Sequence, residues 1–317
     1  MLDLVVQKSN HMYVINHRRI FFALTGLILA GAIGAIAFLG LPLSIDFTGG
    51  SLIEVSYTDT RPNLDEIKGA VNNLALGEIS LRESGNSGVV LRTRTLTPLE
   101  HETVLSVLGG AEQAAFTELR FNSIGPALGS ELGIKALYAL IAVIFSIMLY
   151  IAWAFRTVSR PISSWLYGFS VVVILVHDVI IPVGFYAVLC ALTGAQVDSL
   201  FVVALLAILG YSVNDTIVIF DRVREHLHNN EVANVVESFE QVVGKSITET
   251  MGRSINTSLT VALALIALIL LGSPVTVNFA LVLLMGVVAG TYSSILVAAP
   301  LLVPLAHIFA KPSAPKK

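Results

Sequence analysis

The sequence predicts an α-helical polytopic membrane protein with six transmembrane helices. An α+β domain of ferredoxin-like βαββαβ order is predicted between the first and second helices. Two observations support this class. Hydrophobic residues make up 55% of the 317 residues and charged residues only 13%, unlike the composition of ordinary soluble proteins. Six apolar runs are also present, each near the roughly 20 residues that a helix needs to cross about 30 Å of hydrocarbon.

The six spans are predicted at residues 20–41, 134–155, 164–189, 198–220, 254–272 and 276–299. The first follows Arg18 and Arg19, as the core of a cleavable signal peptide would. Its apolar stretch is longer than the roughly 7 to 15 residues of such a core, so we interpret it as a retained anchor.

The basic residues predict the orientation of the spans. The short connections at residues 190–197 and 273–276 contain no lysine or arginine. The positive-inside rule assigns segments rich in lysine and arginine to the cytoplasm. We therefore predict that residues 42–133 lie on the outer side. The segments predicted to be cytoplasmic are the N-terminus (1–19), the loop 156–163, the loop 221–253 and the tail 310–317.

The outer segment, residues 42–133, reads as one small α+β module. Turn residues at 85–88 separate the two middle strands, as a split βαβ unit requires. Asn63 and Thr97 precede the helical segments and are candidate N-caps. Strands are predicted at residues 51–57, 78–83, 89–95 and 117–123, and helices at 64–74 and 98–108.

Small residues recur every four positions in two spans, which permits close approach of neighbouring helices. They are Gly26, Ala30 and Gly34 in the first span and Gly286 and Gly290 in the last. We predict packing surfaces within one bundle, with a dimer contact as the alternative.

A mixed apolar and charged stretch, residues 235–251, lies in the loop predicted to be cytoplasmic. Two interpretations stay open for it. One is an amphipathic helix on the inner membrane surface, and the other is a solvated connector helix.

Two acids, Asp178 and Asp215, lie inside predicted spans. A carboxylate in mid-span costs at least about 2.5 to 3.5 kcal/mol, so a function or a pairing partner is the first hypothesis. His177 is adjacent to Asp178, but adjacent helical positions do not face each other, so we predict a packed or weakly hydrogen-bonded histidine rather than an acid/base pair. His226 and His228 have a spacing of two and no third ligand, which predicts solvated side chains rather than a metal site.

Asp215 lies six residues before Asp221, about 9 Å along a helix from the inner end of its span. Arg253 begins the next span from the same side, so the two side chains could meet. A carboxylate that alternates between an arginine and a proton is a relay element. The alternative is a structural lock between two helices, with Arg253 extended to the interface. Asn214 and Thr216 flank the acid and could orient it.

Several chemistries are disfavoured by absent motifs. No GxxxxGK[ST] motif occurs, so we expect no Walker-type nucleotide site. Asp215 follows Ser212, Val213 and Asn214 instead of the GxGD pattern of aspartyl intramembrane proteases, and we expect no enzyme activity. Cys190 is the only cysteine, which excludes an internal disulfide and a cysteine metal cluster. The formal net charge of -3 gives no reason to expect nucleic acid as a partner.

Four segments together resemble a known family. They are IDFTGGSLIEV (residues 45–55), FNSIGPALGSEL (121–132), VHDVII (176–181) and GYSVNDTIVIFDRVRE (210–225). In combination they are similar to the SecF subunits of the SecD/SecF family, within the resistance-nodulation-division (RND) superfamily, over essentially the whole chain.

The resemblance implies a subunit of the bacterial inner membrane that pairs with SecD, a related six-span half, beside the SecYEG channel, with YajC and YidC as further possible partners. It implies that an inward proton flow, with no other cofactor, helps to move a translocating polypeptide outward after the SecA motor has threaded it. The outer domain is then periplasmic and supports the emerging chain.

The resemblance also associates the positions of Asp215 and Arg253 with proton conduction. We extend the predicted relay to Asn214 and Asp178, leaving open whether Asp178 is functional or structural. A single six-span half lacks the intramembrane acid of SecD, so any proton path needs the partner.

A second group of residues matches family motifs where the first span meets the outer domain. From the residues alone, these predict turn and hinge geometry. They are Asp46, Phe47, Gly49, Gly50, Gly125, Pro126 and Gly129.

Two other functions stay as alternatives. One is the half-unit of another RND exporter of small molecules or lipids, against which the small outer domain argues. The other is a passive assembly factor for the channel, in which Asp215 and Arg253 serve only as structure.

Overall fold

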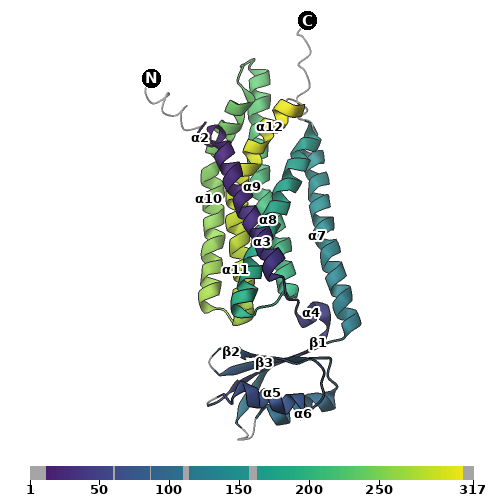
Figure 1. The fold of residues 1–317 in the computed structure, drawn as a ribbon. Helices are drawn as coiled ribbons and strands as arrows, with labels where there is room; N and C mark the ends of the chain where they lie inside the picture. Colours follow the sequence, from purple (N-terminus) through teal and green to yellow (C-terminus); the bar gives the residue numbers. More distant parts are fainter. Residues whose placement is uncertain (1–11, 60, 86, 110–113, 157–162, 310–317) are drawn as a thin grey trace. The chain divides into compact units, whose positions relative to one another are not determined.

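The structure is a computed structural model, and it describes residues 12–309 except 60, 86, 110–113 and 157–162, and except the side chains of 274 and 275. The chain divides into two compact units (Figure 1). The helical unit comprises residues 1–41, 139–195 and 200–317, and the small unit comprises residues 42–138 and 196–199.

Six helices in the described chain are long and apolar enough to cross a membrane, which confirms the predicted number. The six spans are α3 (Arg18–Leu39), α7 (Pro126–Ala154), α8 (Ser164–Thr193), α9 (Ser199–Val232), α10 (Phe239–Leu271) and a last span that joins α11 (Pro274–Ser293), the π-helix η1 (Ser294–Ala298) and α12 (Ala299–Phe309). A short helix, α2 (Tyr13–Asn16), precedes α3.

The predicted connection at residues 221–253 is mostly helical, because α9 continues to Val232 and α10 already begins at Phe239, and its cytoplasmic location stays a prediction. Ser238 starts α10 with a capping box, in which its hydroxyl accepts the N–H of Gln241. Hydropathy marks where lipid ends, whereas a helix continues until its backbone is capped or broken. For the same reason, α7 begins at Pro126, before the predicted start at residue 134, and α12 ends at Phe309, beyond the predicted end at residue 299.

Neither interpretation of residues 235–251, a helix on the inner membrane surface or a solvated connector helix, fits the part from Phe239 onward. From Phe239 onward this stretch forms the first turns of α10. Its apolar residues Val242, Val243 and Ile247 are buried in a cluster with Val14 and Ile15 of α2. Burial against the chain itself, rather than against lipid headgroups, accounts for the apolar face of this segment.

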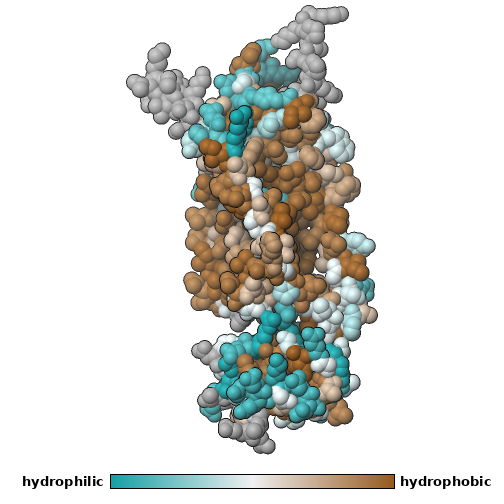
Figure 2. Space-filling view, in the orientation of Figure 1, coloured by the Kyte–Doolittle hydropathy of each residue, from teal (hydrophilic) through white to brown (hydrophobic). Residues whose placement is uncertain are grey.

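The helices of the helical unit differ in how much surface they expose. About half of the residues in the most apolar 18-residue stretch are buried in α8, in α9 and in the last span, whereas only 6% of them are buried in α3. Leu27 and Phe38 of α3 are therefore largely exposed. Figure 2 shows hydrophobic side chains over the middle of the helical unit and hydrophilic ones at its end. Such a surface is soluble only in lipid or against apolar protein.

The small residues contribute unequally to helix packing. A Cβ atom at Gly290 of α11 would lie 2.9 Å from Cβ of Ser212 in α9, which confirms that this stripe packs within the bundle. The prediction is wrong for the first span, because Gly26 and Gly34 have no atom of the described chain within 4 Å of such a position. In α3 it is Ala32 that contacts α8, on a different face of the helix from those glycines.

The small unit has the predicted βαββαβ order, and its sheet has the strand order β2-β3-β1-β4 with antiparallel neighbours. This is the ferredoxin-like arrangement. Figure 1 shows both of its longer helices on one face of the sheet. The elements are β1 (Gly50–Tyr57), α5 (Leu64–Asn72), β2 (Ser80–Ser84), β3 (Gly88–Thr93), α6 (Pro98–Leu108) and β4 (Phe116–Ile124).

Local sequence signals account for these boundaries. The side chains of Asn63 and Thr97 accept backbone N–H groups at the starts of α5 and α6, which confirms both predicted N-caps. The turn before β3 contains Gly85 with φ +61°, while Asn86 of the predicted turn lies outside the described residues. Alternate residues of β1 and β3, including Ile53 and Leu91, are buried in one core with residues of α5 and α6.

The cap of α6 makes a testable electrostatic contribution. Hydrogen bonds from Arg94 and from Thr97 hold the pKa of the Glu100 carboxyl at about 2, below its ordinary 4.5. A lowered pKa in the folded state stabilises the fold above pH 4.5, and this contribution is lost as the pH falls toward 2.

We predict that hydrogen exchange of α6 amides in the full protein is faster in Glu100→Gln than in the parent at pH 6, and that the difference shrinks by pH 3. Glu102→Gln is the control, since no salt bridge is found for Glu102 within the described chain. A difference that grows on acidification contradicts a stabilising role for the ionised Glu100 carboxylate.

Candidate functional site

Asp178 of α8 and Asp215 of α9 both lie inside the helical unit, with exposed fractions of 0% and 5%. Neither carboxylate faces lipid or bulk water. The two acids belong to different polar clusters on different sides of α9.

The cluster around Asp178 is held by hydrogen bonds from three helices. Its carboxylate accepts the hydroxyl of Ser293 at 3.0 Å and the hydroxyl of Ser212, and it bonds Nδ1 of His177 at 2.7 Å. The other ring nitrogen, Nε2 of His177, lies 2.8 Å from the hydroxyl of Tyr292. Both oxygens of Asp178 are therefore engaged, and the cluster joins α8, α9 and α11.

His177 is packed and hydrogen-bonded as predicted, but the prediction that it does not meet Asp178 is wrong. Successive residues on a helix diverge by about 100°, which separates their Cβ atoms. The imidazole is nevertheless long enough for its Nδ1 to turn back to the neighbouring carboxylate, and Tyr292 holds the far edge of the ring. Spacing along one helix could not reveal this contact, because Tyr292 lies 115 residues away in the sequence.

The backbone is irregular on both sides of this cluster. Pro182 lies inside α8 four residues after Asp178, so it offers no N–H to the carbonyl of Asp178. The π-helix η1 begins directly after Ser293, and Ser293 and Ser294 are both fully buried. The hydroxyls of Ser294 and Thr216 are hydrogen-bonded at 2.9 Å. Single π-helical turns within α-helices are frequent at functional sites.

Asp215 faces α10. Ser254 and Ser258 lie beside its carboxylate, and Arg253 is near enough for its charge to act on it. Within the described chain, Oδ2 of Asp215 and the hydroxyl of Ser254 are buried atoms without a hydrogen-bond partner. The hydroxyl of Tyr211 donates to Ser258 at 2.9 Å, which extends the cluster along α9.

The four residues of the predicted relay are thus only partly brought together. Arg253 is exposed, and in the part of the chain that the structure describes no ion pair within 4.0 Å joins it to Asp215. Asn214 is exposed, whereas Thr216 on the other side of Asp215 is buried. Asp178 stands in its own cluster. The roles of these residues stay predictions.

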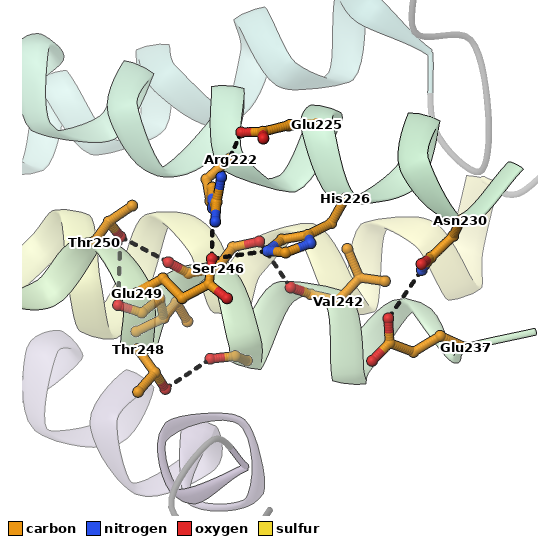
Figure 3. A network of polar contacts seen from close by, with 12 residues as sticks. Arg222, Glu225, His226, Asn230, Glu237, Val242, Ser246, Thr248, Glu249 and Thr250 are labelled. Atoms are coloured by element: carbon orange, nitrogen blue, oxygen red, sulfur yellow. Dashed lines mark hydrogen bonds and ion pairs between the residues drawn. The ribbon is translucent and has the colours of Figure 1, made fainter. Parts of the chain in front are cut away.

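A third polar cluster lies at the end of the α9–α10 hairpin (Figure 3). Glu249 of α10 accepts Nε of Arg222 at 2.5 Å and bonds Nε2 of His226 at 2.9 Å. His226 is only 8% exposed, so the prediction that it is solvated is wrong. Arg222 and His226 are four residues apart and share one face of α9, which is the signal that could have found this cluster.

The glycines at residues 49–50 and 125–129 meet within the small unit. The one-turn helix α4 (Ile45–Thr48) ends at Gly49, which has φ +75°. A Cβ atom at Gly129 would lie 2.6 Å from N of Gly49, and one at Gly49 would lie 2.5 Å from Cα of Pro126. Glycine is thus required at both positions by close backbone approach. Close packing of two backbone segments thus explains why glycine occurs at these positions. The predicted hinge geometry at this junction stays a prediction.

Asp46 and Phe47 have separate contacts in the small unit. Oδ2 of Asp46 accepts the N–H of Ser199 at 2.8 Å, a donor left free at the start of a helix. A Cβ atom at Gly133 would lie 3.6 Å from the Phe47 ring. Arg92 of β3 is near the same acid, although burial and the charges of other arginines lower its pKa to about 10. Sequence inspection had no signal for the contact with Ser199, which is 153 residues distant.

Comparison with known proteins assigns the chain to a family. Residues 104–307 match the family model described as protein export membrane protein SecD/SecF, C-terminal, and residues 34–60 match the SecD/SecF GG motif. The chain belongs to the SecD/SecF family. The predicted resemblance is therefore confirmed, and Gly49 and Gly50 lie within the matched GG segment.

Relatives within the SecD/SecF family cover nearly the whole chain. A protein translocase subunit SecF from Anaerolinea thermophila is 36% identical, with 92% of each chain covered, and one from Thermobaculum terrenum is 35% identical with the same coverage. The crystal structure of SecDF, a translocon-associated membrane protein from Thermus thermophilus, matches with a TM-score of 0.75 and 32% identity over 93% of this chain. The chain spans 38% of the length of that SecDF chain.

The close packing of the GG segment gives one prediction. Gly129→Ala forces the backbones at Gly49 and Gly129 apart and destabilises the small unit by about 1 to 3 kcal/mol. Gly125→Ala is the matched control, because nothing lies within 4 Å of its added methyl group. Hydrogen exchange of residues 45–57 in the full protein measures the difference, and equal protection in both variants refutes this account.

The hydrogen-bonded cluster around Asp178 gives a further prediction. Asp178→Ala leaves the hydroxyls of Ser212 and Ser293 and Nδ1 of His177 without their acceptor, at about 1 to 3 kcal/mol for each group that stays buried. We expect a clear loss of thermal stability in detergent, and a smaller loss in Asp178→Asn, which keeps one acceptor oxygen. Ser130→Ala, on the exposed part of α7, is the control, and a loss of stability as large there indicates a non-specific effect.

Proposed function

We propose that this chain is the SecF-type subunit of a protein translocase in the bacterial inner membrane, with both termini in the cytoplasm, and that it assists Sec-dependent export of proteins. The relatives named protein translocase subunit SecF, matched over 92% of their length, support this proposal most directly. The six apolar helices fit the location.

A SecD subunit is the first proposed partner. The family model that matches the chain is shared by SecD and SecF, and the chain aligns with 38% of a SecDF chain, which supports a SecD-like partner. The apolar surfaces of α3 and α7, which the described chain leaves largely exposed, are available for such a partner or for lipid. We further propose the SecYEG channel, YajC and YidC as neighbours, and a translocating polypeptide as the client of the small unit, which is then periplasmic.

We also propose that the proton gradient drives this task through Asp215. The observation that supports it is a buried carboxylate oxygen without a partner, beside α10 and within reach of the charge of Arg253. Asp215 takes up a proton while the guanidinium stays apart and releases it when the guanidinium comes into contact. Such an exchange needs a carboxylate that is not already satisfied, which Asp215 offers and Asp178 does not.

The proposal gives Asp178 and Asp215 different roles. With both of its oxygens engaged, Asp178 holds α8, α9 and α11 together as the frame in which Asp215 works. Asn214, exposed next to Asp215, is available to a group outside the chain. The acid that completes the path is then contributed by the SecD subunit.

We predict that Asp215→Asn abolishes the proton-dependent stimulation of protein export by membrane vesicles while the variant still co-purifies with SecD. Asp221→Asn, on the same helix, is the matched control. It breaks only an exposed ion pair with Arg224, which is worth about 0 to 1 kcal/mol, and it should export like the parent.

Unchanged stimulation by Asp215→Asn favours a passive assembly factor instead. Recovery of the chain without any SecD-like protein or channel component favours an exporter of small molecules or lipids.

A further inference from the structure

Arg253 of α10 is exposed, and within the described chain no ion pair engages it. Its charge acts on Asp215 of α9, although no contact within 4.0 Å joins the two side chains. The proposed function requires the guanidinium to stay apart from Asp215 while this acid carries a proton. A cation within a membrane span is costly unless an opposite charge lies beside it, so this second position of the guanidinium needs a second acid.

Glu249 lies four residues before Arg253, on the same flank of α10. Such positions are about 6 Å apart along the helix axis and about 40° apart around it. Side chains of a helix lean toward its N-terminus, so the side chain of Arg253 leans toward Glu249. An acid four residues before a base is also the favourable order for an ion pair. In α7, Glu131 and Lys135 form a pair of this kind at 2.7 Å.

One carboxylate oxygen of Glu249 is still available for such a pair. Nε of Arg222 and Nε2 of His226 both contact the other oxygen, Oε2, at 2.5 and 2.9 Å (Figure 3). No hydrogen bond or ion pair from the described residues engages Oε1. Glu225 also binds Arg222, so two acids share one arginine. The group therefore carries an excess negative charge whenever His226 is neutral, one helical turn from Arg253.

The surroundings of Arg253 leave few other positions for its guanidinium. Asp221 is paired with Arg224 and lies on another face of α9, about 120° around the helix from Asp215. Between Asp215 and His226, the interior of the contact between α9 and α10 is filled by buried apolar side chains, so a guanidinium can move only along the outer edge, where Glu249 lies. The apolar residues are Ile219, Val223, Val243 and Ile247.

We propose that Glu249 is the second partner of Arg253 and holds its guanidinium through Oε1 while Asp215 carries a proton. The proposal rests on the proposed function of Asp215. As the guanidinium moves to Glu249, the carboxylate of Asp215 binds a proton, and when that proton leaves, the guanidinium returns. Arg253 keeps a counter-charge in both states, so neither state contains an isolated cation. Glu249 is thus a positioning residue, which acts on Asp215 through Arg253.

The structure of Asp215→Asn in complex with SecD tests this partner without any measurement of transport. Asparagine has the shape of the protonated acid and carries no charge, so it releases the guanidinium. We expect a nitrogen of Arg253 within about 3 Å of Oε1 of Glu249. A guanidinium that stays beside residue 215, or that contacts another group instead of Glu249, overturns the proposal.

The pH dependence of export tests the exchange itself. Without an acid at position 249, the guanidinium remains near Asp215 and opposes its protonation. We therefore expect Glu249→Gln to need a roughly tenfold higher proton concentration on the outer side for half-maximal stimulation of export by membrane vesicles. Glu249→Asp keeps the charge and should stay closer to the parent. Glu240→Gln, on the same helix and paired with His307, is the matched control and should have the profile of the parent.

These variants keep the other titratable groups of both positions. Tyr211 lies beside Asp215, and Arg222, Glu225 and His226 face residue 249. If Glu249→Gln has the pH profile of the parent, Glu249 has no part in the exchange. A fall in stimulation by the same factor at every pH also overturns the proposal, because a merely structural defect gives that result.

The two proposals fail in different ways. If Asp215→Asn leaves the stimulation of export unchanged, the proposed function is wrong, while the structure of that variant still shows whether Arg253 pairs with Glu249. If Asp215→Asn abolishes the stimulation but Glu249→Gln does not shift its pH profile, the proposed function stands and the role of Glu249 is wrong.

Discussion

Hydrocarbon offers no hydrogen-bond partner, so every polar side chain inside the helical unit must find one within the protein or in trapped water. This constraint acts most strongly on α9, which carries polar groups toward two neighbours. Ser212 and Thr216 point to α8 and to the last span, and Tyr211 and Asp215 point to α10. The helices around α9 supply the partners, which are the carboxylate of Asp178 and the hydroxyls of Ser258 and Ser294.

The two acids show opposite solutions to the same constraint. Asp178 is fully satisfied by side chains from three helices, and any change of its partners would leave buried donors unpaired. Asp215 is buried to a similar degree but keeps an oxygen without a partner. The carboxylate of Asp178 is therefore fixed by its hydrogen bonds, whereas the carboxylate of Asp215 keeps one oxygen that no hydrogen bond holds.

The features that the sequence predicted well are those that depend on neighbours along the chain. Hydropathy found the six spans, alternation of apolar residues found the four strands, and Asn63 and Thr97 were recognisable as caps because a cap acts on the residues just after it. The helix ends were predicted less well, since hydropathy stops at the membrane surface while α9 and α10 continue beyond it.

The candidate site was only half visible for a related reason. Asp178 and Asp215 are conspicuous because acids are rare in apolar runs. Their partners are not, since Tyr292 and Ser293 become neighbours of His177 and Asp178 only through the fold.

The π-helix at Ser294–Ala298 has a consequence for how this chain can vary in length. A π-helical turn accommodates one residue more than an α-helical turn, so the last span contains a surplus residue at this point. Deleting one residue elsewhere in a transmembrane helix rotates everything beyond it by about 100° and exposes its buried face. Between Ser294 and Ala298 the same deletion would relax the turn into regular α-helix, which makes this the natural place for a length difference between homologous chains.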